Sequence, residues 1–317
     1  MVRLGIVGTG FGTIGLKPAF ESIRGCTVVG VSSGRDWQSF LERNDLDAVA
    51  IAVPPAAQYR IAKAAIERGL HVFAEKPLAA NAAQARELLA LAKKRRVVHG
   101  IDFIFPEIAA WKKVKELLDK KTLGRLKHVS VEWDWLSGSM RYGKASWKTS
   151  AKEGGGALAF YFSHGLHYLE HFAGKIGTIA TRFARSPLSD DGADLGFDMV
   201  LSFESGATGS VHLSSNTPGY IRHRLAFECE RGVIVLENKN AVVDGFTITA
   251  FSSAGEKRIV VRKDIGRRGE DERVKIVRKL AQRFVAACAQ RAEMRPSFAD
   301  GVRVQELIAL ARKGQMR

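Results

Sequence analysis

The segment after the first predicted strand constrains the fold of this chain more than any other. An apolar run over residues 2–8 leads into GTGFG at residues 8–12, and a helical pattern follows over 14–24. In dinucleotide-binding folds, a buried strand and a tight glycine turn present the free N–H groups of a helix N-terminus to a pyrophosphate. Gly8 is expected to make the turn and Gly10 to let the backbone approach the phosphates. Thr13 stands where the motif usually has its third glycine, and Gly12 lies one position early.

Strand and helix patterns alternate through the first third of the chain, which predicts a parallel sheet. The predicted strands are 2–8, 27–32, 48–53, 70–74 and 97–101, and the predicted helices are 14–24, 36–43, 56–68 and 82–95. The last of these helices is expected to start at an N-cap, Asn81, with Gln84 at its third position as in a capping box. Only one short helix fits between residues 33 and 48, about the minimum for a parallel crossover.

Composition excludes several classes of protein. The net charge of +16 is spread along all 317 residues with acidic residues mixed in, so it favours an anionic substrate or cofactor over nucleic-acid binding. No apolar run reaches the length of a membrane span, and the N-terminus has no signal-peptide pattern. Cys26, Cys229 and Cys288 lack the spacing of a metal site, which predicts reduced thiols, a cytoplasmic protein and no metal.

Two proline-containing segments follow predicted strands, at the sheet edge where α/β folds bind ligands. Val53-Pro54-Pro55 follows the third strand, and Glu75-Lys76-Pro77 follows the fourth. A lysine fixed at such an edge beside a glutamate can donate a hydrogen bond to a substrate oxygen, although a solvated surface lysine is the other interpretation of this position.

These segments resemble the glucose–fructose oxidoreductase, inositol dehydrogenase and rhizopine-catabolism (Gfo/Idh/MocA) family of NAD(P)-dependent oxidoreductases. The resemblance rests on GTGFG, on VPP and on GLHVFAEKPLA at residues 69–79. It continues through Trp147-Lys148, GGGAL at residues 154–158, His164 and the segment PSFADG at residues 296–301. The resemblance spans essentially the whole chain.

The resemblance implies an α/β protein of two domains. A Rossmann NAD(P)-binding domain is expected over 1–104, and a domain for substrate binding and oligomerisation, built on a large, open, mostly antiparallel sheet, over 105–317. The residues of the second part fit this arrangement, since strand patterns and glycine-containing turns alternate there. Its predicted strands are 126–136, 178–185, 197–203, 208–214, 222–229, 232–236 and 246–251. Helices at 106–119, 157–173, 272–290 and 299–313 are expected to cover one face of the sheet, and the other face to form a homodimer or homotetramer.

The chain departs from the family pattern at three places. The outer strand that relatives carry after strand two is missing, so the strand 27–32 is expected at the sheet edge. Gln58 replaces a histidine that often follows the Pro-Pro segment. In the family motif Asp-x-Gly-x-His-x-x-Asp, His164 is kept, whereas Phe160 and His167 replace the two carboxylates.

The family chemistry transfers a hydride between a carbinol carbon and nicotinamide, so a base must take the hydroxyl proton. The resemblance assigns that role to His164, whose type has a suitable pKa, and assigns to Lys76 a hydrogen bond to the same oxygen. The substrate, a sugar, sugar derivative or cyclic polyol, is expected in a cleft between the domains. The residues expected to bind it are Asp102, Trp147, Lys148, Tyr161 and His167.

The end of the second strand predicts the cofactor. No carboxylate follows it until Asp36, whereas Ser33 and Arg35 can bind a 2′-phosphate, so NADP(H) is expected over NAD(H) unless Asp36 turns toward the ribose. The residues expected to bind the cofactor are Gly8, Thr9, Gly10, Phe11, Gly12, Thr13, Ser32, Ser33, Arg35, Val53, Pro54, Pro55, Gln58, Glu75 and Lys76.

Two other functions remain open on the sequence. The loss of the family aspartate at Phe160 is compatible with a nucleotide-binding regulator that has no turnover. An enzyme that cleaves glycosides with redox assistance would also keep the bound nicotinamide. Retention of Lys76 and His164 favours an NAD(P)-dependent dehydrogenase or reductase.

Overall fold

The computed structural model describes residues 1–240 and 242–316, and the chain divides into two compact units. Unit 1 comprises Met1–Ile104 and Ile265–Glu306, and unit 2 comprises Phe105–Asp264 and the residues from Leu307 onward. From the sequence, all of 105–317 is expected in the second domain. The structure differs in one segment, because 265–306 belongs to unit 1. Within the described part of the chain, no helix is both long enough and apolar enough to cross a bilayer.

Unit 1 contains a parallel five-stranded sheet in the order β2-β1-β3-β4-β5. The strands are β1 Val2–Val7, β2 Cys26–Ser32, β3 Ala48–Ile51, β4 His71–Ala74 and β5 His99–Ile101. The five predicted strands are confirmed, and β2 lies at the edge as expected from the short connection after it. All four residues of β3 are buried, as is typical of a parallel sheet covered on both faces.

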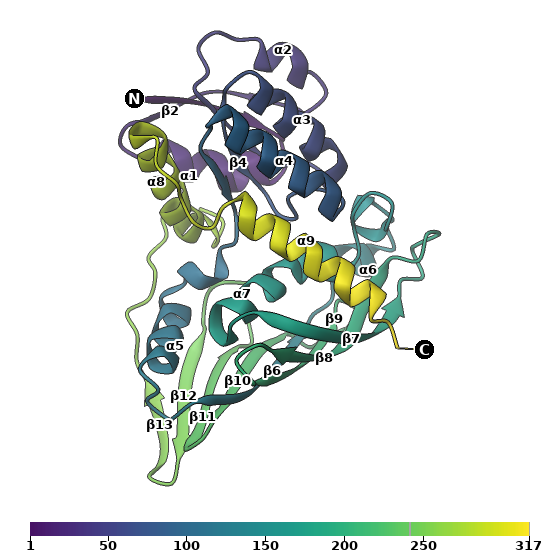
Figure 1. Ribbon diagram of the computed structural model, residues 1–317, viewed down its shortest axis with the longest axis vertical. Coiled ribbons are helices and arrows are strands. Elements are labelled where there is room, and N and C mark those ends of the chain that lie inside the picture. The colour runs from purple at the N-terminus through teal and green to yellow at the C-terminus, as the bar shows by residue number, and fades with distance from the viewer. Residues whose placement is uncertain (241, 317) are drawn as a thin grey trace. The chain divides into compact units, whose positions relative to one another are not determined.

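The helices of unit 1 lie in the predicted segments, with shorter bounds near the N-terminus. They are α1 Lys17–Glu21, α2 Trp37–Leu41, α3 Pro55–Glu67, α4 Ala82–Arg95 and α8 Val274–Gln290. A π-helical turn, η1 Gly12–Leu16, precedes α1. The N-cap prediction is confirmed, since the Asn81 side chain accepts a hydrogen bond from the N–H of Gln84 at 3.0 Å. Helices α3 and α4 lie side by side (Figure 1).

Helix α8 packs in unit 1, whereas we expected it on the second sheet. Phe284 of α8 meets Phe20 of α1 and Phe73 of β4 edge-on, at ring-centroid distances of 6.1 and 5.5 Å. An apolar helix stripe fits any apolar sheet face, so the sequence alone did not show which sheet this helix would cover.

Unit 2 contains an eight-stranded sheet in the order β13-β12-β11-β10-β6-β9-β8-β7, in which only β6 and β9 pair in parallel. Its strands are β6 Leu126–Asp134, β7 Ile176–Arg185, β8 Asp194–Phe203, β9 Thr208–Ser214, β10 Arg222–Cys229, β11 Gly232–Asn238, β12 Thr247–Ser252 and β13 Gly255–Ile259. The seven predicted strands are present. The edge strand β13 was missed because its residues, GEKRI, are mostly exposed and lack apolar alternation.

Two helices cover one face of this sheet, α5 Ala109–Asp119 and α7 Ser163–Ala173 (Figure 1). Trp111 of α5 packs against Tyr168 of α7 and against His223 of β10, which fixes both helices on the same face. The remaining elements are short turns, a short helix and the C-terminal helix. They are η2 Phe105–Glu107, α6 Gly138–Tyr142, η3 Trp147–Thr149, η4 Ala157–Tyr161 and α9 Phe298–Lys313, which is shared by the two units.

Candidate active site

The glycine turn after β1 has the geometry that a pyrophosphate requires. Gly8 has a φ of +123°, and a Cβ atom there would lie 2.2 Å from the carbonyl oxygen of Ala52, so no other residue fits. A Cβ on Gly10 would meet nothing within 4 Å. Among the residues that the structure describes, the N–H groups of Thr9, Gly10 and Phe11 donate to no acceptor. Open N–H groups beside a side-chain-free backbone fit a dinucleotide pyrophosphate.

The turn continues into η1 rather than into a regular α-helix. The ring of Phe11 lies directly over Gly15, where a Cβ atom would be 2.2 Å from the ring. The guanidinium of Arg273 lies 4.3 Å from the Phe11 ring centroid. Asp271 holds Arg273 through two hydrogen bonds of 2.8 Å. Sequence reasoning missed Arg273 because it belongs to the segment 265–306, more than 250 positions along the chain from the glycine turn.

The carboxylate of Asp36 lies beside the end of β2, although Asp36 comes four positions after the last strand residue, Ser32. Ser32 and Ser33 donate hydrogen bonds to Asp36 Oδ1 at 3.1 and 2.7 Å. The Ser33 hydroxyl, with the backbone and Ser32, lowers the pKa of Asp36. Arg35 is exposed beside them. The Ser33 hydroxyl, which we expected to bind a 2′-phosphate, therefore donates its hydrogen bond to Asp36 in this structure.

Gln58 has a role that its position after the Pro-Pro segment did not suggest. Its side chain is 1% exposed, and Nε2 donates to the carbonyl oxygens of Glu75, Pro77 and Leu78 at 2.6, 3.0 and 3.2 Å. One amide on α3 thus fixes the backbone on both sides of Lys76. Pro54 and Pro55 start α3, and this places Gln58 one turn later, facing the end of β4.

Asp102 follows β5 and is 2% exposed, next to the Glu75-Lys76 segment that follows β4. Burial, the charge of Glu75 and a hydrogen bond with Glu75 raise the pKa of Asp102 well above its ordinary value, against the opposing charges of Lys76 and Arg273. The predicted contact of Asp102 with a substrate stays a prediction.

In unit 2, the predicted residues lie on and around η4 and the first turn of α7. His164 is 8% exposed, and its ring meets Phe105 edge-on at 5.0 Å between centroids. His167 is half-buried one turn later. Trp147 and Phe160 are in edge contact at 4.9 Å, and Lys148 Nζ lies 4.7 Å from the Phe160 ring centroid. Phe160 stands where the family motif has a carboxylate, and here it makes aromatic and cation–π contacts instead.

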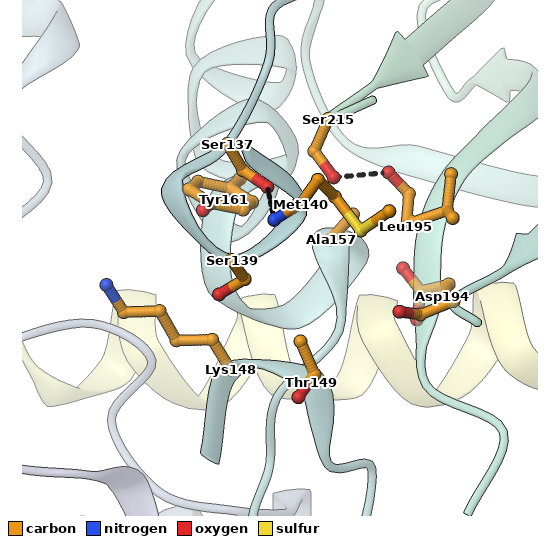
Figure 2. Close-up of a pocket in the computed structure, with 11 residues that line it drawn as sticks. Ser137, Ser139, Met140, Lys148, Thr149, Ala157, Tyr161, Asp194, Leu195 and Ser215 are labelled. Atoms are coloured by element: carbon orange, nitrogen blue, oxygen red, sulfur yellow. Dashed lines mark hydrogen bonds between the residues drawn. The ribbon is translucent and has the colours of Figure 1, made fainter. Parts of the chain in front are cut away.

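A small cavity of about 20 Å³ lies beside η4, large enough for about one water molecule. Figure 2 shows Tyr161 and Asp194 on opposite sides of it, with hydroxyl groups between them. Its lining includes two of the predicted substrate residues, Lys148 and Tyr161, and the hydroxyls of Ser137, Ser139, Thr149, Ser186 and Ser215. The hydroxyl groups suit a bound water molecule, because each hydroxyl both donates and accepts.

Asp194 positions η4 and was not predicted from the sequence. Its carboxylate accepts a hydrogen bond from the N–H of Leu158 at 2.6 Å, and burial raises its pKa. A Cβ on Gly156, whose φ is +95°, would lie 2.4 Å from the same carboxylate. Asp194 begins β8, and no local pattern links it to a turn 36 residues earlier.

Within the described ranges, 1–240 and 242–316, no group of three or more His, Cys, Asp or Glu side chains is placed to hold a metal ion. Lys76 belongs to unit 1 and His164 to unit 2.

Comparisons with known proteins agree with this architecture. Residues 16–103 match the NAD-binding Rossmann fold of an oxidoreductase family, and residues 111–235 match the GFO/IDH/MocA C-terminal domain. The chain belongs to the Gfo/Idh/MocA oxidoreductase family. The expectation from the sequence motifs is thereby confirmed.

Several relatives in sequence are named oxidoreductases. An uncharacterized oxidoreductase of Synechocystis sp. is 28% identical, over 98% of this chain and 93% of its own length. A dTDP-3,4-didehydro-2,6-dideoxy-alpha-D-glucose 3-reductase of Saccharopolyspora spinosa is 27% identical, over 82% of this chain and 79% of its own. The levoglucosan dehydrogenase of Pseudarthrobacter phenanthrenivorans is 27% identical, over 59% of this chain and 54% of its own.

Solved structures share the fold at lower identity. A levoglucosan dehydrogenase in complex with NADH and levoglucosan has a TM-score of 0.84 at 20% identity, covering 99% of this chain and 96% of its own. At that identity the likeness shows the shared fold alone.

Proposed function

We propose that this protein transfers a hydride between a nicotinamide cofactor and a carbinol or carbonyl carbon of a sugar, sugar derivative or cyclic polyol. The observation that carries the proposal is Lys76, placed at the end of β4 and fixed by Gln58, in the unit whose glycine turn fits a pyrophosphate. Family membership gives the reaction class. The sugar substrates named for the levoglucosan dehydrogenase and the dTDP-sugar reductase support the substrate class.

The cofactor, when bound, supplies the hydride acceptor or donor. The N–H groups of Thr9, Gly10 and Phe11 would hold its pyrophosphate, with Gly8, Gly12 and Thr13 shaping the turn. Val53, Pro54 and Pro55 would form the rim beside it, with Gln58 and Glu75 fixing the neighbouring segment.

The protein's own residues would move the proton. His164 takes the hydroxyl proton of the substrate, and Lys76 donates a hydrogen bond to the same oxygen and stabilises its developing negative charge. Trp147, Lys148, Tyr161 and His167 bind the substrate around η4, where Phe160 makes the surroundings less polar than a carboxylate would.

We further propose that NADP(H) is preferred over NAD(H). The exposed guanidinium of Arg35 can pair with a 2′-phosphate, and the Ser33 hydroxyl can turn to the same group. The opposing argument is the carboxylate of Asp36, held at the end of β2 by Ser32 and Ser33, which would repel that phosphate. Fluorescence titration of both cofactors into wild type, Arg35→Ala and Asp36→Asn tests this choice. Tighter NAD(H) binding by wild type, or unchanged NADP(H) affinity in Arg35→Ala, would refute it.

A second function, a nucleotide-binding regulator, is supported by Phe160, which stands where the family has an aspartate. Assays of wild type with a panel of sugars and cyclic polyols separate the two functions, because a regulator binds the cofactor without turning over any of them.

Oligomeric state and location are also proposals. We propose a homodimer or homotetramer through the face of the eight-stranded sheet opposite α5 and α7, as the family resemblance implies. The three free thiols support a cytoplasmic protein.

A further inference from the structure

Two carboxyl groups lie side by side at the ends of β4 and β5. Ala74 and Ile101 pair in register as the last residues of these strands, so Glu75 and Asp102 are neighbours immediately beyond them. The N–H of Asp102 donates to the carbonyl oxygen of Ala74 at 3.0 Å, which fixes this register. Asp102 is 2% exposed, whereas Glu75 is half-buried.

One oxygen of each carboxyl lacks a donor. Glu75 Oε1 and Asp102 Oδ1 are both buried and accept no hydrogen bond from any N–H or O–H group of the described residues. The two carboxyl groups are in hydrogen-bond contact with each other. Two ionised carboxylates in contact would repel, and neither carries a donor. A proton on one of them supplies the missing donor and removes the repulsion.

The surrounding charges identify which carboxyl holds the proton. Lys76 and Arg273 are the cations that act on Asp102, and both favour its ionised form, whereas burial and Glu75 oppose ionisation and prevail. Arg273 is itself held by Asp271. Glu75 is less buried than Asp102, and its Oε2 already accepts a hydrogen bond from the backbone N–H of Lys76 at 3.2 Å, so Glu75 is the acceptor of the pair.

We propose that Asp102 is a positioning residue that stays protonated at neutral pH and donates a hydrogen bond to the Glu75 carboxylate. The pair then carries one negative charge beside Lys76, and the hydrogen bond fixes the side chain that precedes Lys76. In this role Asp102 acts on Lys76 through Glu75. This inference concerns the site of the proposed oxidoreductase and rests on that function only for its kinetic consequences.

The direct test uses the protein without cofactor or substrate. Carbon-13 NMR of side-chain carboxyls, with the Asp102 resonance assigned by its loss in Asp102→Asn, follows each titration. We expect Asp102 to remain protonated above pH 7. The surface carboxyl of Asp45, whose pKa is lowered by its hydrogen bonds with Arg43, serves as the reference group that is ionised at neutral pH. Ionisation of Asp102 near pH 4 would overturn the proposal whether or not the protein is an enzyme.

The kinetic test compares two replacements of the same residue. Asp102→Asn keeps a neutral donor, whereas Asp102→Leu removes the donor, so the kcat of Asp102→Asn is expected to exceed that of Asp102→Leu by at least about tenfold. If Asp102→Asn loses as much kcat as Asp102→Leu, the carboxylate itself is required and the proposal is wrong. If wild type turns over no substrate, the proposed function fails, and the NMR titration still decides the state of Asp102.

Discussion

The Gln58 amide lies 2.6 Å from the carbonyl oxygen of Glu75, and this contact joins the start of α3 to the segment that carries Lys76. The same nitrogen also donates to Pro77 and Leu78. The amide therefore holds the backbone around Lys76 from a position in which the side chain is 1% exposed. The placement of Lys76 thus depends on a residue on another element.

Replacing Gln58 by alanine is expected to destabilise unit 1. Three buried carbonyl groups share this donor, and loss of a buried partner costs about 1–3 kcal/mol. Urea denaturation measures the change in the free energy of unfolding, with the exposed Gln38→Ala as a matched control. Equal stabilities of the two variants would contradict the role given to Gln58.

Asp194 is expected to stabilise η4 through its acceptor oxygen. Asp194→Ala leaves the N–H of Leu158 without this partner and should lower the free energy of unfolding by about 1–3 kcal/mol. Asp194→Asn keeps an acceptor oxygen and should lose less, because burial already disfavours the charged form of Asp194. The exposed Asp190→Ala is the control. A larger loss in Asp194→Asn than in Asp194→Ala would show that this account of η4 is wrong.

His223 is expected to make the protein acid-sensitive. Burial lowers the pKa of His223 to about 3, while the unfolded chain has a pKa near 6.5, so the unfolded state binds the proton first as pH falls. Stability is therefore complete above about pH 6.5 and falls between pH 6.5 and 3, by at most about 1.4 kcal/mol per pH unit from this residue.

The variant His223→Phe tests this linkage. The ring that stacks on Trp133 at 4.2 Å is kept, while the titrating group and its contact with the Tyr168 hydroxyl are removed. The difference in unfolding free energy between pH 7 and pH 5 should be smaller in the variant than in wild type. An identical pH dependence would exclude His223 as the cause.

The sequence predicted the helices and strands more accurately than the surfaces on which they pack. The apolar runs that became β1 to β5 identified the parallel sheet, and the glycine turn identified its binding edge. The edge strand β13 was not predicted, because almost none of its residues are buried. Helix α8 was predicted on the wrong sheet, because an apolar stripe does not determine which surface the helix packs against.

The long-range polar contacts could not be predicted from the sequence either. Gln58 with Glu75, Asp194 with Leu158 and Asp102 with Glu75 each join side chains to groups on other elements. Such pairs have no fixed spacing, since the fold alone brings them together. The motif residues were found because they are close in sequence, and the residues that position them were not.

Turnover of Lys76→Ala tests the central claim most directly. Wild type, Lys76→Ala and His164→Ala would be assayed on a panel of sugars and cyclic polyols through the absorbance of the reduced nicotinamide. Lys63→Ala, which removes a surface lysine whose side chain is 40% exposed, is the control. We predict that each active-site variant loses about 10²–10⁴-fold in kcat, while His164→Ala keeps its affinity for the cofactor. Full turnover by Lys76→Ala on a substrate that wild type uses would contradict the account.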